Sequence, residues 1–344
     1  MQLYLLGILV KIVKISALKS GGISMPLSEQ HQHSIHQLHQ LMDTVNQIVI
    51  GKKDVTKLTV TAMLAGGHVL FEDIPGVGKT LLVKTIAKTL NAPFSRIQFT
   101  PDLVPSDIIG FSIPLTEKAQ FEFRKGPIFS SLILADEINR TSPRTQAAML
   151  EAMSEGQVTM DGETYDLPEP FFVLATQNPI EHEGTYPLPE AQLDRFLMQL
   201  SLGYPTVEQE VQMLSNPNQK EALSRIQPLL SLDKFQELKQ LVPTVYVQPD
   251  LFTYIVKLGD STRTNPAIRL GVSPRGNQYC LAAARAHALL DMRDYVTPDD
   301  ILAVLPAVYQ HRLLFKDYLS PRQKTDAIHS LIQKVSVPIK RGRK

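Results

Sequence analysis

Short apolar runs alternate with longer amphipathic stretches through the first half of the chain. Residues 30–48, 51–65 and 81–90 carry apolar side chains every three or four positions, which predicts three helices. Four short apolar runs predict buried strands and comprise residues 68–71, 96–99, 131–135 and 171–176. Strands that alternate with helices are typical of a parallel sheet covered on both faces. The pattern therefore predicts an α/β domain.

The strand pattern fades after about residue 231, where helical periodicity takes over. Amphipathic segments at residues 234–241, 251–262, 277–290 and 299–313 predict a small all-α domain. Before it, a polar turn flanked by apolar residues predicts a β-hairpin insert at about residues 100–126. We therefore expect an N-terminal extension (1–24), the α/β core (25–215), a linker (216–230), the all-α domain (231–338) and a basic tail (339–344).

The composition is typical of a globular protein with two domains. The 344 residues are 43% hydrophobic and 20% charged, without the compositional signs of disorder. The formal net charge is +1, so the protein as a whole would attract neither nucleic acid nor anionic lipid. Its one cysteine, Cys280, excludes an internal disulfide. We expect a buried thiol and a cytoplasmic protein.

An apolar segment at residues 3–10 is interrupted by Lys11 and Lys14, well before the roughly 20 residues that a membrane span requires. A secretory signal would carry its lysines before the apolar run, so we expect neither a signal peptide nor a membrane span. We hypothesise that translation begins at Met25, because the codons of two glycines just upstream could form a ribosome-binding site. The intact mass of the natively expressed protein distinguishes this start from Met1.

Four histidines lie within nine residues of the first predicted helix. Such a cluster can bind a metal ion, but its neighbours are glutamine and serine rather than further metal ligands. We therefore favour a solvated helix face and leave metal binding open. The four are His31, His33, His36 and His39.

A glycine-rich loop follows the first predicted strand and precedes a helix. It matches the phosphate-binding pattern G-x-x-x-x-G-K-[ST], except that Asp73 replaces the first glycine and adds a negative charge. In this pattern, backbone N–H groups surround the phosphates, the lysine reaches the terminal phosphate, and the hydroxyl holds Mg²⁺. We expect ATP to be bound here, with Lys79 on the phosphates and Thr80 on the metal. The expected ATP-binding residues are Pro75, Gly76, Val77, Gly78, Lys79, Thr80 and Leu81.

The third predicted strand ends in two acids, Asp136 and Glu137. Buried charge is costly, so an apolar strand that ends in two carboxylates indicates a function for them. Asp136 would hold Mg²⁺ through water. Glu137, which points the opposite way along the strand, would polarise a water for attack on the γ-phosphate. An acidic pair alone is a weak signal, but downstream of a phosphate loop it predicts an ATPase.

Several blocks, in the same order, resemble the MoxR family of AAA+ ATPases. They comprise residues 49–51, 70–80, 99–107, 126–129, 135–140, 146–153 and 175–179. The resemblance extends from about residue 48 to residue 313, and in that family Asp73 is an accepted variant of the loop. It implies a AAA+ core, with a phosphate loop and a parallel sheet between helices, followed by a small all-α lid domain.

The same resemblance assigns roles to residues outside the phosphate loop. Ile50 and Gly51 would pack against adenine. Asn178, which follows the fourth predicted strand, would be the polar sensor that positions the attacking water, since an amide both donates and accepts. Judged in isolation, an Asn before a proline is better explained as a turn former.

Two arginines complete the site that the resemblance implies. Arg195, within the block 188–196, is similar to the arginine finger that acts on a neighbouring subunit's ATP. A structural role for Asp194 and Arg195 at the surface is the alternative. Arg275 is similar to the second sensor, which would reach the nucleotide from the lid. Four further arginines are left without a role, namely Arg140, Arg144, Arg263 and Arg269.

The resemblance implies a ring, expected to be a hexamer, that uses ATP and Mg²⁺ to remodel or mature another protein. MoxR-like proteins often work with proteins that contain a von Willebrand factor A domain, but nothing in the sequence names the client. Two alternatives stay open. A nucleic-acid-dependent motor has weak support from Lys118, Arg124 and Lys125 of the hairpin. A slow nucleotide-gated switch is disfavoured by the intact Glu137.

Overall fold

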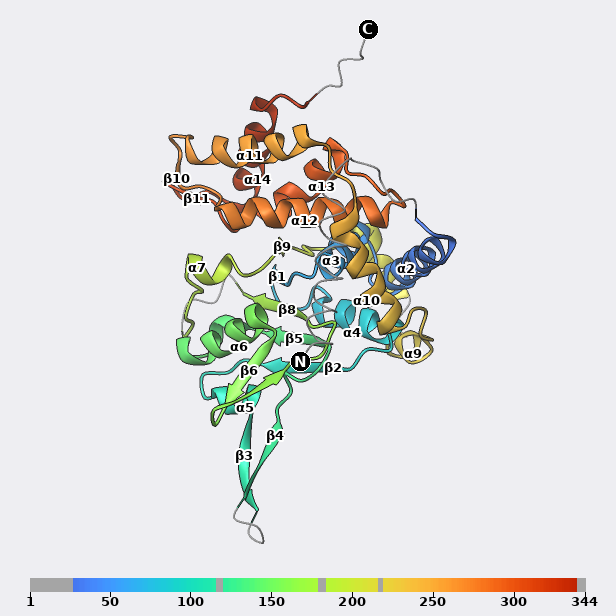
Figure 1. The fold of residues 1–344 in the computed structure, drawn as a ribbon, viewed down its shortest axis with the longest axis vertical. Helices are drawn as coiled ribbons and strands as arrows, with labels where there is room; N and C mark the ends of the chain where they lie inside the picture. Colours follow the sequence, from blue (N-terminus) through green and yellow to red (C-terminus); the bar gives the residue numbers. More distant parts are fainter. Residues whose placement is uncertain (1–26, 116–119, 179–183, 216–218, 339–344) are drawn as a thin grey trace, which may run out of the picture.

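A five-stranded parallel sheet, in the order β2-β5-β8-β1-β9, forms the centre of the protein (Figure 1). The computed structural model describes residues 27–115, 120–178, 184–215 and 219–338. The N-terminal extension, Met25, Lys118 and the basic tail lie outside these residues. The strands are β1 (Val69–Glu72), β2 (Phe94–Gln98), β5 (Leu132–Asp136), β8 (Phe172–Gln177) and β9 (Met198–Leu200).

Each face of the sheet has its own hydrophobic core, because successive residues of a strand point to opposite faces. In β1, Val69 and Phe71 belong to one core and Leu70, between them, to the other. The helices of the first core are α2 (Glu29–Ile48), α3 (Lys53–Leu64) and α4 (Lys79–Thr89). The main helix of the second core is α6 (Pro143–Glu155). Burial on both faces explains why the strands read as continuous apolar runs.

The C-terminal helices lie above the sheet in Figure 1. They are α10 (Leu232–Leu241), α11 (Pro249–Arg263), α12 (Pro274–Leu290), α13 (Pro298–Tyr309) and α14 (Pro321–Lys334). α12 packs against α13 and also against α3, so the first core continues from the α/β part into the helical part. Cys280 is buried within α12, as expected. A short antiparallel pair, β10 (Ile268–Leu270) with β11 (Leu314–Phe315), accompanies the helices.

Two β-hairpins extend from the α/β part. The predicted insert contains α5 (Pro105–Ile109) and a hairpin of β3 (Gly110–Leu115) and β4 (Gln120–Lys125), which projects away from the sheet in Figure 1. The second hairpin, β6 (Gln157–Met160) with β7 (Glu163–Asp166), was not predicted. The aromatic rings of Phe123 and Tyr165 stack at 4.4 Å between the two hairpins.

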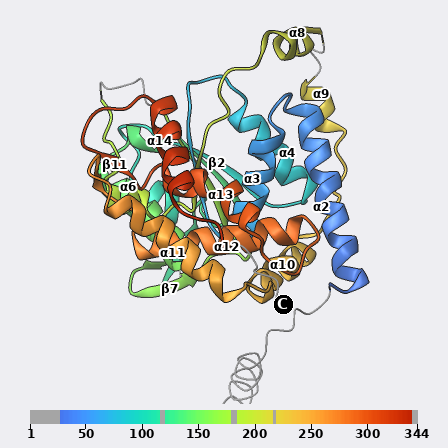
Figure 2. The ribbon, with the colours of Figure 1, turned by 90° about the horizontal axis from the view of Figure 1, so that it is seen from above.

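The segment between the two parts of the chain is also helical in places. A short α7 (Glu190–Leu193) precedes β9, and α8 (Val207–Ser215) follows it, set apart from the other helices in Figure 2. The region expected as a linker, residues 216–230, contains helix α9 (Gln219–Ser224). No helix among the described residues is both long and apolar enough to cross a membrane.

The four histidines of α2 do not bring three metal ligands together in the described part of the chain. Nε2 of His39 instead lies 2.7 Å from the carbonyl of Leu290. A grouping that resembles a metal site, of His287, Asp291 and Asp300, does occur at α12 and α13. The guanidinium of Arg293 contacts Asp300 with two nitrogens at 2.6 Å, so this grouping is an ion-pair network.

His68, just before β1, is fully buried and held in its neutral form. Its Nδ1 accepts from the backbone N–H of Val173 at 3.1 Å, so Nε2 carries the hydrogen that is donated to the carbonyl of Met153 at 2.9 Å. Burial lowers the pKa of His68 from 6.5 to about 4, and nearby Lys239 acts in the same direction. The His68 imidazole therefore binds a proton more tightly in the unfolded chain than in the folded one.

This difference predicts a pH-dependent contribution to stability. The folded-state pKa of His68 lies below the unfolded value, so the contribution is present above pH 6.5 and is lost as the pH falls towards 4. Urea unfolding at pH 7 and pH 4 should show that the unfolding free energy of the wild type falls by about 3 kcal/mol more than that of His68→Gln. Equal losses in the two proteins would contradict this assignment.

Candidate functional site

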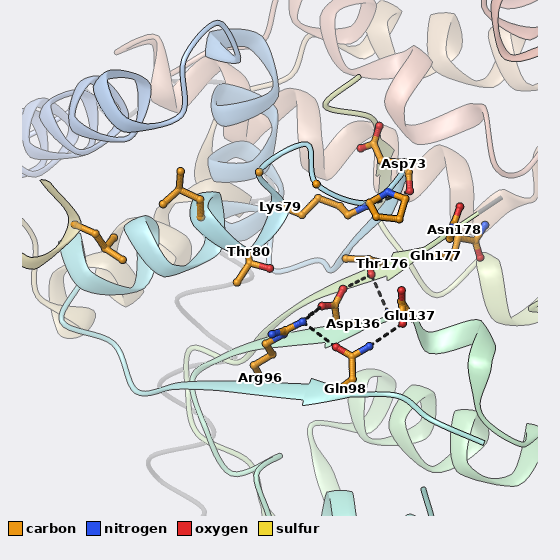
Figure 3. Close-up of a pocket in the computed structure, with 15 residues that line it drawn as sticks. Asp73, Lys79, Thr80, Arg96, Gln98, Asp136, Glu137, Thr176, Gln177 and Asn178 are labelled. Atoms are coloured by element: carbon orange, nitrogen blue, oxygen red, sulfur yellow. Dashed lines mark hydrogen bonds and ion pairs between the residues drawn. The ribbon is translucent and has the colours of Figure 1, made fainter. Parts of the chain in front are cut away.

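A cavity of about 460 Å³ lies where four of the central strands end at the carboxyl edge of the sheet (Figure 3). Ligands of open parallel sheets bind outside this edge, because the loops and helix N-termini converge there. Leu223 of α9 closes part of the cavity. The predicted site residues that line it are Pro75, Gly76, Gly78, Lys79, Thr80, Leu81, Asp136, Glu137 and Asn178.

The phosphate loop connects β1 to α4 and is shaped by two glycines. Gly76 and Gly78 have φ angles of 85° and 103°, which residues other than glycine rarely adopt. A Cβ built on either glycine would meet open space. No side chain caps the N-terminus of α4. The loop therefore presents backbone N–H groups to the cavity, an arrangement that suits an anion.

Lys79, the first residue of α4, points back along the loop. Its Nζ donates to the carbonyls of Asp73 and Ile74, both at 3.0 Å. Partial burial lowers the pKa of Lys79, and this effect is opposed by the nearby carboxylates of Asp73, Asp136 and Glu137. A lysine with a shifted pKa in a cavity is a candidate functional residue.

Asp73 has a structural role that the sequence does not indicate. Its buried carboxylate accepts from the Ser201 hydroxyl at 2.7 Å and from the backbone N–H groups of Leu202 and Gly203 at 2.7 and 3.0 Å. Asp73 also has no positive φ, so its backbone conformation does not require a glycine. An aspartate is tolerated at this position because it ties the loop to the segment after β9.

The two acids both line the cavity, although strand alternation alone would separate them. Glu137 lies just beyond β5 with φ 59° and ψ 50°, a left-handed conformation that costs about 1 kcal/mol or more for a side chain without special stabilisation. The Thr176 hydroxyl holds the turn: it accepts from the Glu137 N–H at 2.8 Å and donates to Asp136 Oδ1 at 2.7 Å. β8 thereby fixes both acids at the edge of the sheet.

Two residues of β2 also line the cavity, and the sequence analysis missed them. Arg96 forms an ion pair with Asp136 at 2.6 Å, and Gln98 donates to Glu137 Oε2 at 2.7 Å. Both side chains point to the same face of β2, while Ile97 between them is buried in the core. The sequence feature that could have identified them is the alternation of polar and apolar residues in β2, which pairs with β5, the strand that ends in Asp136.

Of the other predicted site residues, some line the cavity and some do not. Asn178 is buried directly after β8 and lines the cavity. Val77 packs against the first core instead. Ile50 is buried and Gly51 is exposed; neither lines the cavity, and a Cβ on Gly51 would collide with the Gln209 side chain of α8.

Arg195 and Arg275 do not line the cavity of their own chain. Nη1 of Arg195 donates to the carbonyl of Leu150, on α6, at 2.6 Å. Arg275 is exposed in the first turn of α12, whose N-cap is Ser273. An action of either arginine on a nucleotide therefore requires a second subunit or a movement of the helical part.

The buried guanidinium of Arg312 connects the segment of Arg195 to the helical part. Its Nε lies 2.7 Å from Asp194 Oδ1, and its Nη2 donates to the carbonyls of Asp194 and Phe196 at 3.1 and 2.5 Å. The hydroxyl of Ser273 also donates to Asp194, at 3.2 Å. The helix start that carries Arg275 is thus joined to the segment that carries Arg195.

The structure places the four arginines that were left without a role. Arg140 pairs with Glu137 at 3.0 Å, so it belongs to the surroundings of the cavity. Nε of Arg263 donates to the carbonyl of Val272 at 2.9 Å. Arg144 and Arg269 are exposed, on α6 and β10.

The role of Asp73 can be tested by restoring the usual glycine. Asp73→Gly should lower the urea unfolding free energy by about 2 kcal/mol, because the buried N–H of Leu202 and the half-buried N–H of Gly203 lose their acceptor. Asp73→Asn keeps an acceptor oxygen and should lose less. Asp73→Gly should not tighten binding of a fluorescent ATP analogue. If Asp73→Gly is as stable as the wild type and binds the nucleotide better, the structural role is wrong.

The chain is similar to known ATPases over most of its length. Residues 68–198 match the ATPase family associated with various cellular activities (AAA), and residues 260–331 match the AAA lid domain. The Bacillus subtilis protein YeaC is 46% identical over 91% of this chain and 98% of its own length. Chaperone MoxR1 of Mycobacterium tuberculosis is 39% identical over 88% of this chain and 83% of its own. The solved structure of a candidate ATPase from Cytophaga hutchinsonii has a TM-score of 0.82 at 37% identity and covers 90% of this chain and 98% of its own. The chain therefore belongs to the MoxR family of AAA+ ATPases.

Proposed function

We propose that this ATPase hydrolyses ATP with Mg²⁺ in the cavity at the phosphate loop, and that it works within a ring to remodel a client protein. The observation that carries the proposal is the convergence of Lys79, Asp136 and Glu137 on one cavity at the carboxyl edge of the sheet. These side chains come from two separate segments of the chain, the start of α4 and the end of β5, and together they supply a phosphate ligand, a metal ligand and a base.

The geometry fits a triphosphate and a hard divalent cation. The open space above Gly76 and Gly78 leaves room for phosphates against the N-terminus of α4, and Lys79 would exchange its two loop carbonyls for phosphate oxygens. The Thr80 hydroxyl and the Asp136 carboxylate line the same cavity and offer the oxygen ligands that Mg²⁺ prefers. Bound Mg²⁺ would offset the charge of the phosphate oxygens.

Glu137 is the proposed general base and Asn178 the proposed polar sensor. Glu137 is fixed at the cavity by its bonds to Gln98, Arg140 and the Thr176 hydroxyl, so its carboxylate would accept the proton of an attacking water. Asn178, buried on the neighbouring strand end, would orient that water through its amide. Ile50 and Gly51 remain the proposed contacts of the adenine.

We propose that the ring is hexameric and that Arg195 acts on the ATP of a neighbouring subunit. Arg195 does not line the cavity of its own chain, which supports an action in trans. Arg275 would reach the nucleotide of its own chain when the helical part closes. The Asp194–Arg312 ion pair and the Ser273 hydrogen bond support coupling between these two arginines, since they join the segments that carry them.

The client is proposed to be a protein, and a partner with a von Willebrand factor A domain is the expected class. The name of the relative chaperone MoxR1 supports a chaperone-like role. The projecting β3–β4 hairpin is the proposed pore element of the ring. In the hairpin, Nζ of Lys125 lies 4.9 Å from the centre of the Phe129 ring, which is a cation–π contact. The charge of Lys125 thus already has a partner in the protein, so it gives a nucleic-acid-dependent motor little support.

The first test concerns Glu137. Glu137→Gln should lower phosphate release from ATP by at least about 10²-fold, because the general base is lost, while binding of a fluorescent ATP analogue is retained. Glu155→Gln, at the exposed end of α6, is the matched control and should leave turnover unchanged. Unchanged turnover in Glu137→Gln would remove the general-base assignment. Negligible turnover in the wild type would favour the slow nucleotide-gated switch.

The second test concerns Arg195 and the ring. Arg195→Ala should lower turnover by roughly 10³-fold while each chain still binds nucleotide. When equal amounts of Arg195→Ala and Lys79→Ala chains are mixed, some interfaces combine the intact nucleotide site of the first variant with the intact Arg195 of the second. In a randomly mixed ring this holds for about a quarter of the interfaces, and activity should return there. Arg144→Ala, which removes an exposed arginine, is the control. If the mixture stays as inactive as its components, Arg195 does not act in trans.

A further inference from the structure

Both oxygens of the Asp136 carboxylate are already engaged by side chains of the protein (Figure 3). Arg96 donates to Oδ2 twice, from Nε at 3.1 Å and from Nη2 at 2.6 Å. The Thr176 hydroxyl donates to Oδ1 at 2.7 Å. An ionised carboxylate offers about two acceptor positions on each oxygen, so Arg96 fills those of Oδ2.

The position of Arg96 conflicts with a divalent cation at the same carboxylate. Arg96 carries a permanent positive charge, and two cations a few ångströms apart repel each other strongly near the protein interior. Asp136 is the better shielded partner, with 14% of its side chain exposed against 47% for Arg96. The guanidinium can therefore swing out into solvent, whereas the carboxylate cannot follow it.

The fold does not require this ion pair. β2 and β5 pair through a continuous parallel register that includes Gln98 opposite Asp136, and the buried side chain of β2 is Ile97 rather than Arg96. A half-exposed ion pair contributes little to stability. Arg96 thus lies on the wall of the cavity without a part in the core.

Arg96 also links the two acids of the cavity. Its Nη2 donates to Gln98 Oε1 at 2.8 Å, and Gln98 Nε2 donates to Glu137 Oε2 at 2.7 Å. A continuous chain of hydrogen bonds therefore runs from Asp136 through Arg96 and Gln98 to Glu137. When Arg96 leaves Asp136, Gln98 loses the donor that orients its amide, and its hold on Glu137 weakens.

We propose that Arg96 is the resident counter-ion of Asp136, which Mg²⁺ has to displace when it binds with the nucleotide. Arg96 is then a positioning residue that sets the Mg²⁺ concentration the site needs. Its displacement connects metal binding at Asp136 to a weaker hold of Gln98 on Glu137. This inference rests on the proposed metal site of Thr80 and Asp136.

The test is a Mg²⁺ titration of binding, with a fluorescent ADP analogue so that hydrolysis plays no part. Arg96→Gln removes the competing charge and should lower the half-saturating Mg²⁺ concentration by about fivefold, in line with the strength of a half-exposed ion pair. Arg96→Lys keeps the charge without the two-nitrogen contact and should fall between Arg96→Gln and the wild type. Without Mg²⁺, in EDTA, all three proteins should bind the analogue with similar affinity, which also shows that they are folded.

Arg225→Gln is the matched control. It removes another arginine–carboxylate ion pair, with Glu221, that is more exposed and does not line the cavity. Its Mg²⁺ titration should match that of the wild type. A shift equal to that of Arg96→Gln would show that the effect is not specific to Asp136 and would overturn the proposal.

Two further results would overturn the role of Arg96. If Arg96→Gln needs the same or more Mg²⁺ than the wild type, Arg96 does not compete with the cation. If its ADP affinity in EDTA falls by about tenfold, Arg96 is a phosphate ligand instead. Failure of the proposed metal site looks different, because nucleotide binding by the wild type itself would then not respond to Mg²⁺.

Discussion

The parallel sheet, buried on both faces, is the constraint from which the site follows. Along β1, β5 and β8 each apolar side chain meets one of two apolar cores, so charge in the middle of these strands would be costly. Polar side chains therefore gather where the strands end. The phosphate loop, the acidic pair and Asn178 all lie at that edge because three strands run in the same direction and stop at the same level.

Two carboxylates connect segments that lie far apart in the sequence. Asp73 joins the phosphate loop to the segment that follows β9. Asp194 joins the segment of Arg195 to α12 and α13 through Ser273 and Arg312. A closing movement of the helical part would thus be transmitted to the segment of Arg195, the residue proposed to act on a neighbouring subunit. Such connections give a AAA+ ATPase a physical route from hydrolysis to assembly.

The sequence predicted the α/β order, the phosphate loop and the acidic pair, because each has a local pattern. It could not predict β9, which has three residues and no periodicity, or the hairpin of β6 and β7. The partners of Asp73 are 128 to 130 residues away, so its structural role has no local signal. Arg96 and Gln98 were visible as alternate polar residues, but their meaning depends on which strand lies beside β2.

The roles of the site residues are tested most directly by a structure of the Glu137→Gln protein with ATP and Mg²⁺. We expect phosphates over Gly76 and Gly78, with Lys79 moved from the carbonyls of Asp73 and Ile74 to the phosphate oxygens. We also expect a cation between the Thr80 hydroxyl and Asp136. Nucleotide bound outside this cavity, or a cation that does not contact Thr80 or approach Asp136, would contradict these roles.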